Sequence, residues 1–128
     1  MEYKKALGEL YRGAKEKYNI QECPKLILKQ DEENAKKIFG RTAYYSPEER
    51  LIVVYITNRH PKDILRSFCH EVIHHHQNER GDLEMGDASS PTYAQDDDHM
   101  RKMEMEAYLK GNMLFRDWED KTKKEIKK

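Results

Sequence analysis

The sequence predicts a single α+β domain with a small mixed sheet, a central helix behind its last strand, and helices at both ends. Two patterns lead to this class. Apolar residues recur at helical spacing in the first, middle and last parts of the chain, and short β-branched runs lie between the first two. The 128 residues suffice for one modest core. We expect one domain over 1–120 and a basic tail over 121–128.

The N-terminal part of the chain is expected to contain a helix, a strand and a short helical segment. Pro24 precedes an apolar run over 25–29 that suits a strand, and the polar residues 31–40 have helical character that ends at Gly40. The first helix is amphipathic, with Lys and Glu between its apolar positions. Those positions are Tyr3, Leu7, Leu10, Tyr11, Ala14 and Tyr18.

Two further strands and two long helices are expected after this segment. Aromatic and β-branched residues predict strands that form a hairpin, and a proline after the second strand favours the start of a helix. A polar, glycine-containing loop then precedes a last helix. The expected bounds are 42–45 and 51–57 for the strands, Pro61 or Asp63 to about Glu79 for the middle helix, and about Asp97 to Asp120 for the last helix.

The composition argues against several classes of partner. The 24 basic and 24 acidic residues cancel, so no overall charge favours nucleic acid or an anionic membrane. No apolar stretch approaches the roughly 20 residues that span a bilayer, and the charged N-terminus lacks the apolar core of a signal peptide. Cys23 and Cys69 lie far apart, which favours reduced thiols in a cytoplasmic protein.

A metal-binding motif, HExxH, lies in the middle helix. On a helix, His70 and His74 stand one turn apart on the same side, so both imidazoles can bind one zinc ion at about 2.0–2.1 Å. Glu71 is displaced about 100° around the helix, where its carboxylate can act as general base on a water at the metal. The apolar stripe of this helix lies roughly 150° from the histidines, so the opposite side can face a cleft.

The neighbouring residues of the motif are interpreted as supporting residues. His75 and His76 are expected to pack or to support the site rather than to bind the metal. Cys69 is expected to be a small core residue beside the site.

A third protein ligand is expected from the last helix, because a catalytic zinc site ordinarily takes three protein ligands and a water. We favour Glu104, which has only apolar or small residues at helical contact spacing. Glu106 is the alternative, but it lies near two lysines with which it can form ion pairs. His99 is a weaker candidate, and the carboxylates of 96–98 follow. The contact positions around Glu104 are Met100, Ala107, Tyr108 and Gly111.

Together, HEVIHHHQ and the later EMEAY resemble the gluzincin group of zinc metallopeptidases, which carries HExxH on one helix and ExxA on the next. The resemblance implies His70, His74 and Glu104 as zinc ligands and Glu71 as general base. The stretch over 51–118 also resembles small phage-encoded proteins of the metallopeptidase type. The chain departs from the gluzincins at Tyr108, where many have Asp or Asn, so the partner of a zinc-bound histidine is left unidentified.

The resemblance also implies a function. We expect a zinc metallopeptidase with one Zn²⁺ per chain that hydrolyses a protein or peptide substrate. Tyr93, His99 and Tyr108 are candidates to stabilise the oxyanion, and the strand over 51–57 is expected to offer an edge to an extended peptide. The chain is expected to be a monomer in the cytoplasm, which is the host cytoplasm if the protein is phage-encoded.

Two other classes of function stay open. The chain could be a catalytically weak metal-binding module, such as a regulator or a phage assembly factor. It could also be a purely structural domain whose histidines hold no metal.

Overall fold

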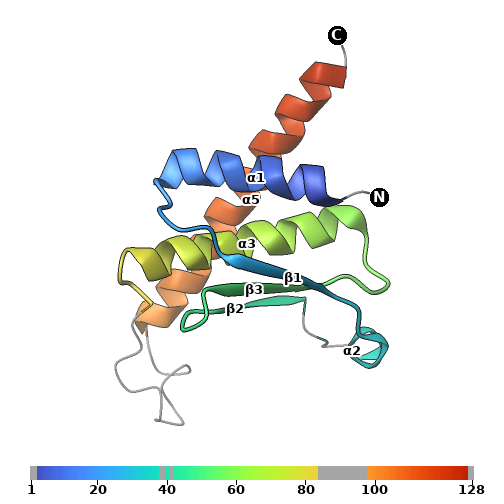
Figure 1. Ribbon diagram of the computed structural model, residues 1–128, viewed down its shortest axis with the longest axis horizontal. Coiled ribbons are helices and arrows are strands. Elements are labelled where there is room, and N and C mark those ends of the chain that lie inside the picture. The colour runs from blue at the N-terminus through green and yellow to red at the C-terminus, as the bar shows by residue number, and fades with distance from the viewer. Residues whose placement is uncertain (1–2, 38–39, 41, 84–97, 127–128) are drawn as a thin grey trace.

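A three-stranded sheet and three long helices make up the fold in the computed structural model (Figure 1). The structure describes residues 3–37, 40, 42–83 and 98–126, with side chains through 123. Helix α3 packs on one face of the sheet, and α1 and α5 pack on α3. The predicted α+β class with a small mixed sheet is confirmed. The elements are α1 (Tyr3–Tyr18), β1 (Lys25–Lys29), α2 (Glu32–Lys36), β2 (Ala43–Ser46), β3 (Leu51–Tyr55), α3 (Pro61–Glu79) and α5 (Asp98–Ile126).

The strand order is β1-β3-β2, with β3 parallel to β1 and antiparallel to β2. The expected hairpin is confirmed, and its connection ends at Arg50, which has a positive φ of 51°. The expectation that the strand over 51–57 offers a free edge is wrong, because β3 lies between its two neighbours. Four of the five residues of this central strand, LIVVY, are buried, whereas β1 carries lysines at both ends as edge strands often do.

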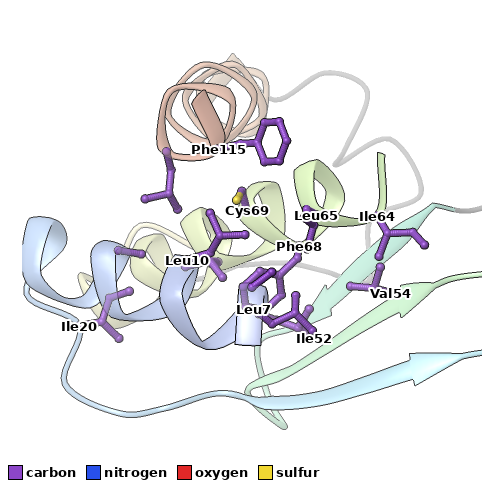
Figure 2. Close-up of a cluster of buried hydrophobic side chains, with 14 residues drawn as sticks. Leu7, Leu10, Ile20, Ile52, Val54, Ile64, Leu65, Phe68, Cys69 and Phe115 are labelled. Carbon is purple, nitrogen blue, oxygen red and sulfur yellow. The ribbon is translucent and has the colours of Figure 1, made fainter. Parts of the chain in front are cut away.

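The hydrophobic core lies between the sheet and the three long helices. Figure 2 shows Leu7 and Leu10 of α1 near Phe68 of α3, and Phe115 of α5 approaching α3 near Cys69. Every second residue of β3 faces this core, as expected for a strand with one face under a helix. The apolar stripe predicted for the middle helix is buried here. Its members are Leu65, Phe68, Cys69, Val72 and Ile73.

The helix ends agree with the local sequence signals, with two differences: α2 ends at Lys36, before the expected end at Gly40, and α5 ends later than expected. Helix α3 begins at Pro61, and the His60 side chain accepts a hydrogen bond from the backbone of Lys62. Helix α5 continues to Ile126, beyond the expected end at Asp120, because the lysine-rich segment favours a helix and Lys123 lies 3.9 Å from Glu119 one turn earlier. None of the described helices is both long enough and apolar enough to cross a membrane.

Helices α3 and α5 lie in close contact at Gly111. A Cβ atom built there would lie 3.0 Å from both the backbone nitrogen and the Cα of His70, and 3.2 Å from the carbonyl carbon of Cys69. Because these are backbone atoms, no side chain can move aside to make room. The absence of a side chain at Gly111 therefore sets the distance between α5 and the helix that carries the HExxH motif.

Replacing Gly111 with Ala is expected to destabilise the protein, although Ala favours a helix over Gly by about 1 kcal/mol. The added methyl group would press α5 away from α3, and overpacking of this kind costs about 1–3 kcal/mol. Gly8→Ala on α1 is the matched control, because its Cβ would meet nothing within 4 Å. Urea unfolding should show a loss of stability for Gly111→Ala and a gain for Gly8→Ala. Equal gains in both would contradict the close packing.

Candidate metal centre

The two histidines of the motif lie on the side of α3 that faces α5. Their ring centroids are 4.9 Å apart, as one helical turn requires. His74 is 7% exposed, whereas His70 is partly open to solvent. Glu71 is 6% exposed and lines the same cleft as both histidines. The local geometry predicted from the HExxH spacing is therefore present.

Helix α5 brings Glu104 to these histidines. Its Oε1 atom lies 2.8 Å from Nε2 of His74, and its Oε2 atom lies 3.4 Å from Nε2 of His70. The potential ligand atoms of the three residues all lie within 4.8 Å of one another. Ligands of a tetrahedral zinc ion are separated by roughly 3.4 Å, so small side-chain movements would let all three bind one ion. The side chain of Glu104 stays 60% exposed, because it lies at the rim of the cleft and not inside the core.

The charges of the cluster depend on one another. Hydrogen bonds from His70 and His74 hold the pKa of Glu104 far below its ordinary value. Burial alone would lower the pKa of His74, but the hydrogen bond to Glu104 and the nearby Glu71 raise it above the ordinary value. Burial raises the pKa of Glu71, against the opposing effect of the two histidines. A proton on His74 thus occupies the position that a cation can take, and metal binding there would release it.

Glu106 points away from the histidines and is held by cations. Its carboxylate pairs with Arg80 and, at 2.8 Å, with Lys110 one turn later on α5. Burial acts to raise the pKa of Glu106, but hydrogen bonds from Arg80, Lys110 and Gln77 lower it to about 2. The ion pair with Lys110 is the one expected from the sequence. Of the two glutamates, the structure brings only Glu104 to the histidines.

Gln77, the last residue of HEVIHHHQ, contacts the cluster in a way that the sequence analysis did not predict. Its Oε1 atom lies 2.8 Å from Nδ1 of His74, and its Nε2 atom donates to the Met103 carbonyl and to Glu106. Gln77 is therefore the hydrogen-bond partner of His74, a partner that the departure from the gluzincin pattern at Tyr108 had left unidentified. The signal that could have found it is its spacing of three residues from His74, which places both on one side of α3.

The cluster opens into a cleft of about 880 Å³. Strand β2, with Tyr44 and Tyr45, forms one wall, α3 forms the floor, and Glu104 and Tyr108 of α5 form the opposite wall. Among the described residues β2 pairs only with β3, so its other edge is free at the cleft. The edge expected on the 51–57 strand is thus replaced by the edge of the first strand of the hairpin.

Arg59 connects the hairpin side of the cleft to helix α3. Its guanidinium donates to the carbonyls of Thr42 and Tyr55 and to the hydroxyl of Ser67 on α3. Burial lowers the pKa of this side chain from its ordinary value, against the opposing effect of Asp63. From sequence, the segment after β3 predicted only a strand break. In the structure it also carries the residue that joins both strands of the hairpin to the HExxH helix.

The other residues of the motif are supporting residues. His75 is fully buried, with Nδ1 2.7 Å from the Tyr45 hydroxyl and Nε2 2.6 Å from the Glu22 carbonyl. The ring of His76 lies 5.0 Å from that of Tyr18. Both rings lie outside the His70–His74–Glu104 cluster. Cys69 is buried in the core, and burial raises the pKa of its thiol.

The remaining candidates differ in position. Nε2 of His99 donates to the Asp82 carbonyl at 2.6 Å, and His99 is neither part of the His70–His74–Glu104 cluster nor among the residues that line the described cleft. Asp98 is exposed at the start of α5, 4.0 Å from Arg101. Tyr108 lines the cleft and is 69% exposed. Tyr93 and the carboxylates at 96–97 lie outside the described residues.

Comparisons with known proteins add no relative to this picture. No family model, no curated protein and no solved structure was found to match the chain. The resemblance to gluzincins therefore stays a prediction that rests on the two motifs. The functional argument is carried by the geometry of the site.

Zinc titration of Glu104→Gln and Glu106→Gln tests which glutamate completes the site. Loss of a residue that hydrogen-bonds to a metal ligand typically weakens affinity about 10–100-fold. Glu104→Gln should weaken zinc affinity by more than this, because an amide oxygen is a poor substitute for a carboxylate ligand. Glu106→Gln should stay within about tenfold of the wild type, since its amide oxygen can still accept from Gln77. If Glu106→Gln is the variant that loses zinc, the roles of the two residues are reversed.

Proposed function

We propose that the chain is a zinc-dependent peptidase with His70, His74 and Glu104 as metal ligands and Glu71 as general base. The observation that carries the proposal is the position of the Glu104 carboxylate, within 3.4 Å of Nε2 of both histidines and beside a buried glutamate. Two imidazoles and one carboxylate are the donor set of a known class of catalytic zinc site. The residues present therefore fit zinc.

The chain's own residues supply proton transfer and orientation. When bound, zinc acts as a Lewis acid and brings the pKa of a bound water toward neutrality. Glu71 accepts the proton of the attacking water and returns it to the leaving amine. The raised pKa of Glu71, caused mainly by burial, brings its basicity closer to the working pH. Tyr108 is the candidate of the three that lines the described cleft, where its hydroxyl can stabilise the developing oxyanion.

A peptide or protein substrate fits the form of the cleft. The free edge of β2 borders the cleft and offers backbone groups to which an extended peptide can add as a further strand. The proposal includes one Zn²⁺ per chain and a monomer that works in the cytoplasm. The location is supported by two free cysteines, Cys23 and Cys69.

Metal analysis tests the binding part of the proposal. Protein purified without a histidine tag and reconstituted with zinc should hold about one ion per chain, and His70→Ala or His74→Ala should abolish retention. His75→Ala is the control, because it should lower the melting temperature by removing hydrogen bonds to Tyr45 and Glu22 while zinc is retained. If the wild-type protein stays metal-free, the remaining hypothesis is a purely structural domain whose histidines hold no metal.

Peptidase activity of Glu71→Gln tests the catalytic part. Gln has the shape of Glu but does not accept the proton, so turnover of a peptide library should fall by about 10²–10⁴-fold while zinc stays bound. Zinc content and the melting temperature are measured on the same sample. Unchanged turnover would exclude Glu71 as the base. Zinc binding without any turnover in the wild type would favour the catalytically weak metal-binding module.

A further inference from the structure

Gln77 links the HExxH helix to the helix that carries the third potential ligand. We infer that Gln77 is a positioning residue that fixes the tautomer of His74 and keeps the Glu104 carboxylate beside the two histidines. The inference rests on the proposed zinc function and adds to it a role for Gln77, to which the sequence analysis assigned none. It follows from three hydrogen bonds of one fully buried amide.

The orientation of this amide is dictated by its neighbours on α5. Nε2 of Gln77 lies 2.9 Å from the Met103 carbonyl oxygen and 2.8 Å from Oε1 of Glu106. Both oxygens can only accept, so the NH₂ group must face α5. A flipped amide would place its oxygen against two other oxygens and lose both hydrogen bonds to α5. Because Gln77 is 0% exposed, water has no access to compensate.

The amide orientation in turn determines the tautomer of His74. With its NH₂ group on α5, Gln77 presents Oε1 to Nδ1 of His74 at 2.8 Å. Oε1 only accepts, so Nδ1 must carry the proton of that hydrogen bond. Once His74 has released its Nε2 proton to a metal ion, the neutral imidazole keeps its one N–H at Nδ1, and Nε2 is left with its lone pair. Nε2 is the atom that lies 2.8 Å from Glu104, on the side where zinc would bind.

The same amide also sets the position of α5 along α3. Its two acceptors, Met103 and Glu106, lie on either side of Glu104 in the sequence of α5. Glu106 is itself held by Arg80 of the segment that follows α3. A displacement of α5 along its axis would break the bonds to Gln77 before it moved Glu104 far from the histidines. Gln77 thus acts on two potential ligands, one through its oxygen and one through its nitrogen.

Zinc affinity of Gln77→Met is the first test. Met fills a similar volume but offers neither the acceptor nor the donors, and loss of such a supporting residue typically weakens metal binding about 10–100-fold. Asn78→Leu is the matched control on the next residue of α3. It removes hydrogen bonds to the Tyr45 hydroxyl and the Pro47 carbonyl, neither of which belongs to the His70–His74–Glu104 cluster, so it should lower stability while zinc affinity stays near that of the wild type.

A spectroscopic measurement on the wild type covers the case in which Gln77→Met does not fold. Long-range ¹H–¹⁵N correlation spectra of the zinc-loaded protein should show His74 with a protonated Nδ1 and zinc on Nε2. A general loss of stability would not specify this tautomer, so the readout separates positioning from a merely structural role. Zinc on Nδ1 of His74 would overturn the inference.

The outcomes also separate this inference from the proposed function. If the wild type binds no zinc, the proposed function fails first. If the wild type binds zinc and folded Gln77→Met binds it equally well, the inference is overturned while the proposed function stands. An equal loss of affinity in folded Asn78→Leu would likewise overturn it, because any lost amide on α3 would then have the same effect.

Discussion

The packing of α5 against α3 at Gly111 is the contact on which the site depends. A Cβ atom at Gly111 would lie 3.0 Å from backbone atoms of His70, so at this position the two helices meet backbone to backbone. This close approach helps the side chain of Glu104 to reach the imidazoles of the neighbouring helix. Ala107 is fully buried one turn earlier and extends the same close contact toward Glu104. Small residues thus bring a potential ligand within reach.

Burial divides the carboxylates near this contact into different roles. Glu104 is more than half exposed and is held in its ionised form by the histidines, which suits a metal ligand. Glu71 is almost fully buried, and burial raises its pKa, which suits a group that takes up a proton and returns it. Glu106 is engaged by Arg80 and Lys110 and acts through Gln77. Three glutamates of one chain therefore differ in chemistry because their neighbours differ.

The hairpin gives the site its second wall. Arg59 donates hydrogen bonds to Thr42, the residue before β2, to Tyr55 of β3 and to Ser67 of α3, and so helps to keep the free edge of β2 beside the HExxH helix. His75 of α3 supports the same arrangement, because its ring is hydrogen-bonded to the Tyr45 hydroxyl of β2. Arg59, which precedes the HExxH helix, and His75, which directly follows the motif, thus position the strand along which a peptide would lie.

The sequence alone was sufficient for features that depend on a single element. Apolar spacing predicted α1 and α3 closely, and the HExxH spacing placed His70, Glu71 and His74 on one side of a helix, because covalent geometry fixes residues one turn apart. It also favoured Glu104 over Glu106 through the small residues around it. The end of α5 was predicted too early because lysines and glutamates were interpreted as a solvated tail, although they also favour a helix.

Relations between elements were decided only by the tertiary structure. The central position of β3 depends on which strands pair, and the local pattern of LIVVY is compatible with either a central or an edge strand. The role of Gln77 depends on the backbone carbonyl of Met103, twenty-six residues away, which no spacing rule connects to it. Distances within a helix follow from its bonds, whereas distances between helices follow from how their side chains pack, and that is a property of the whole fold.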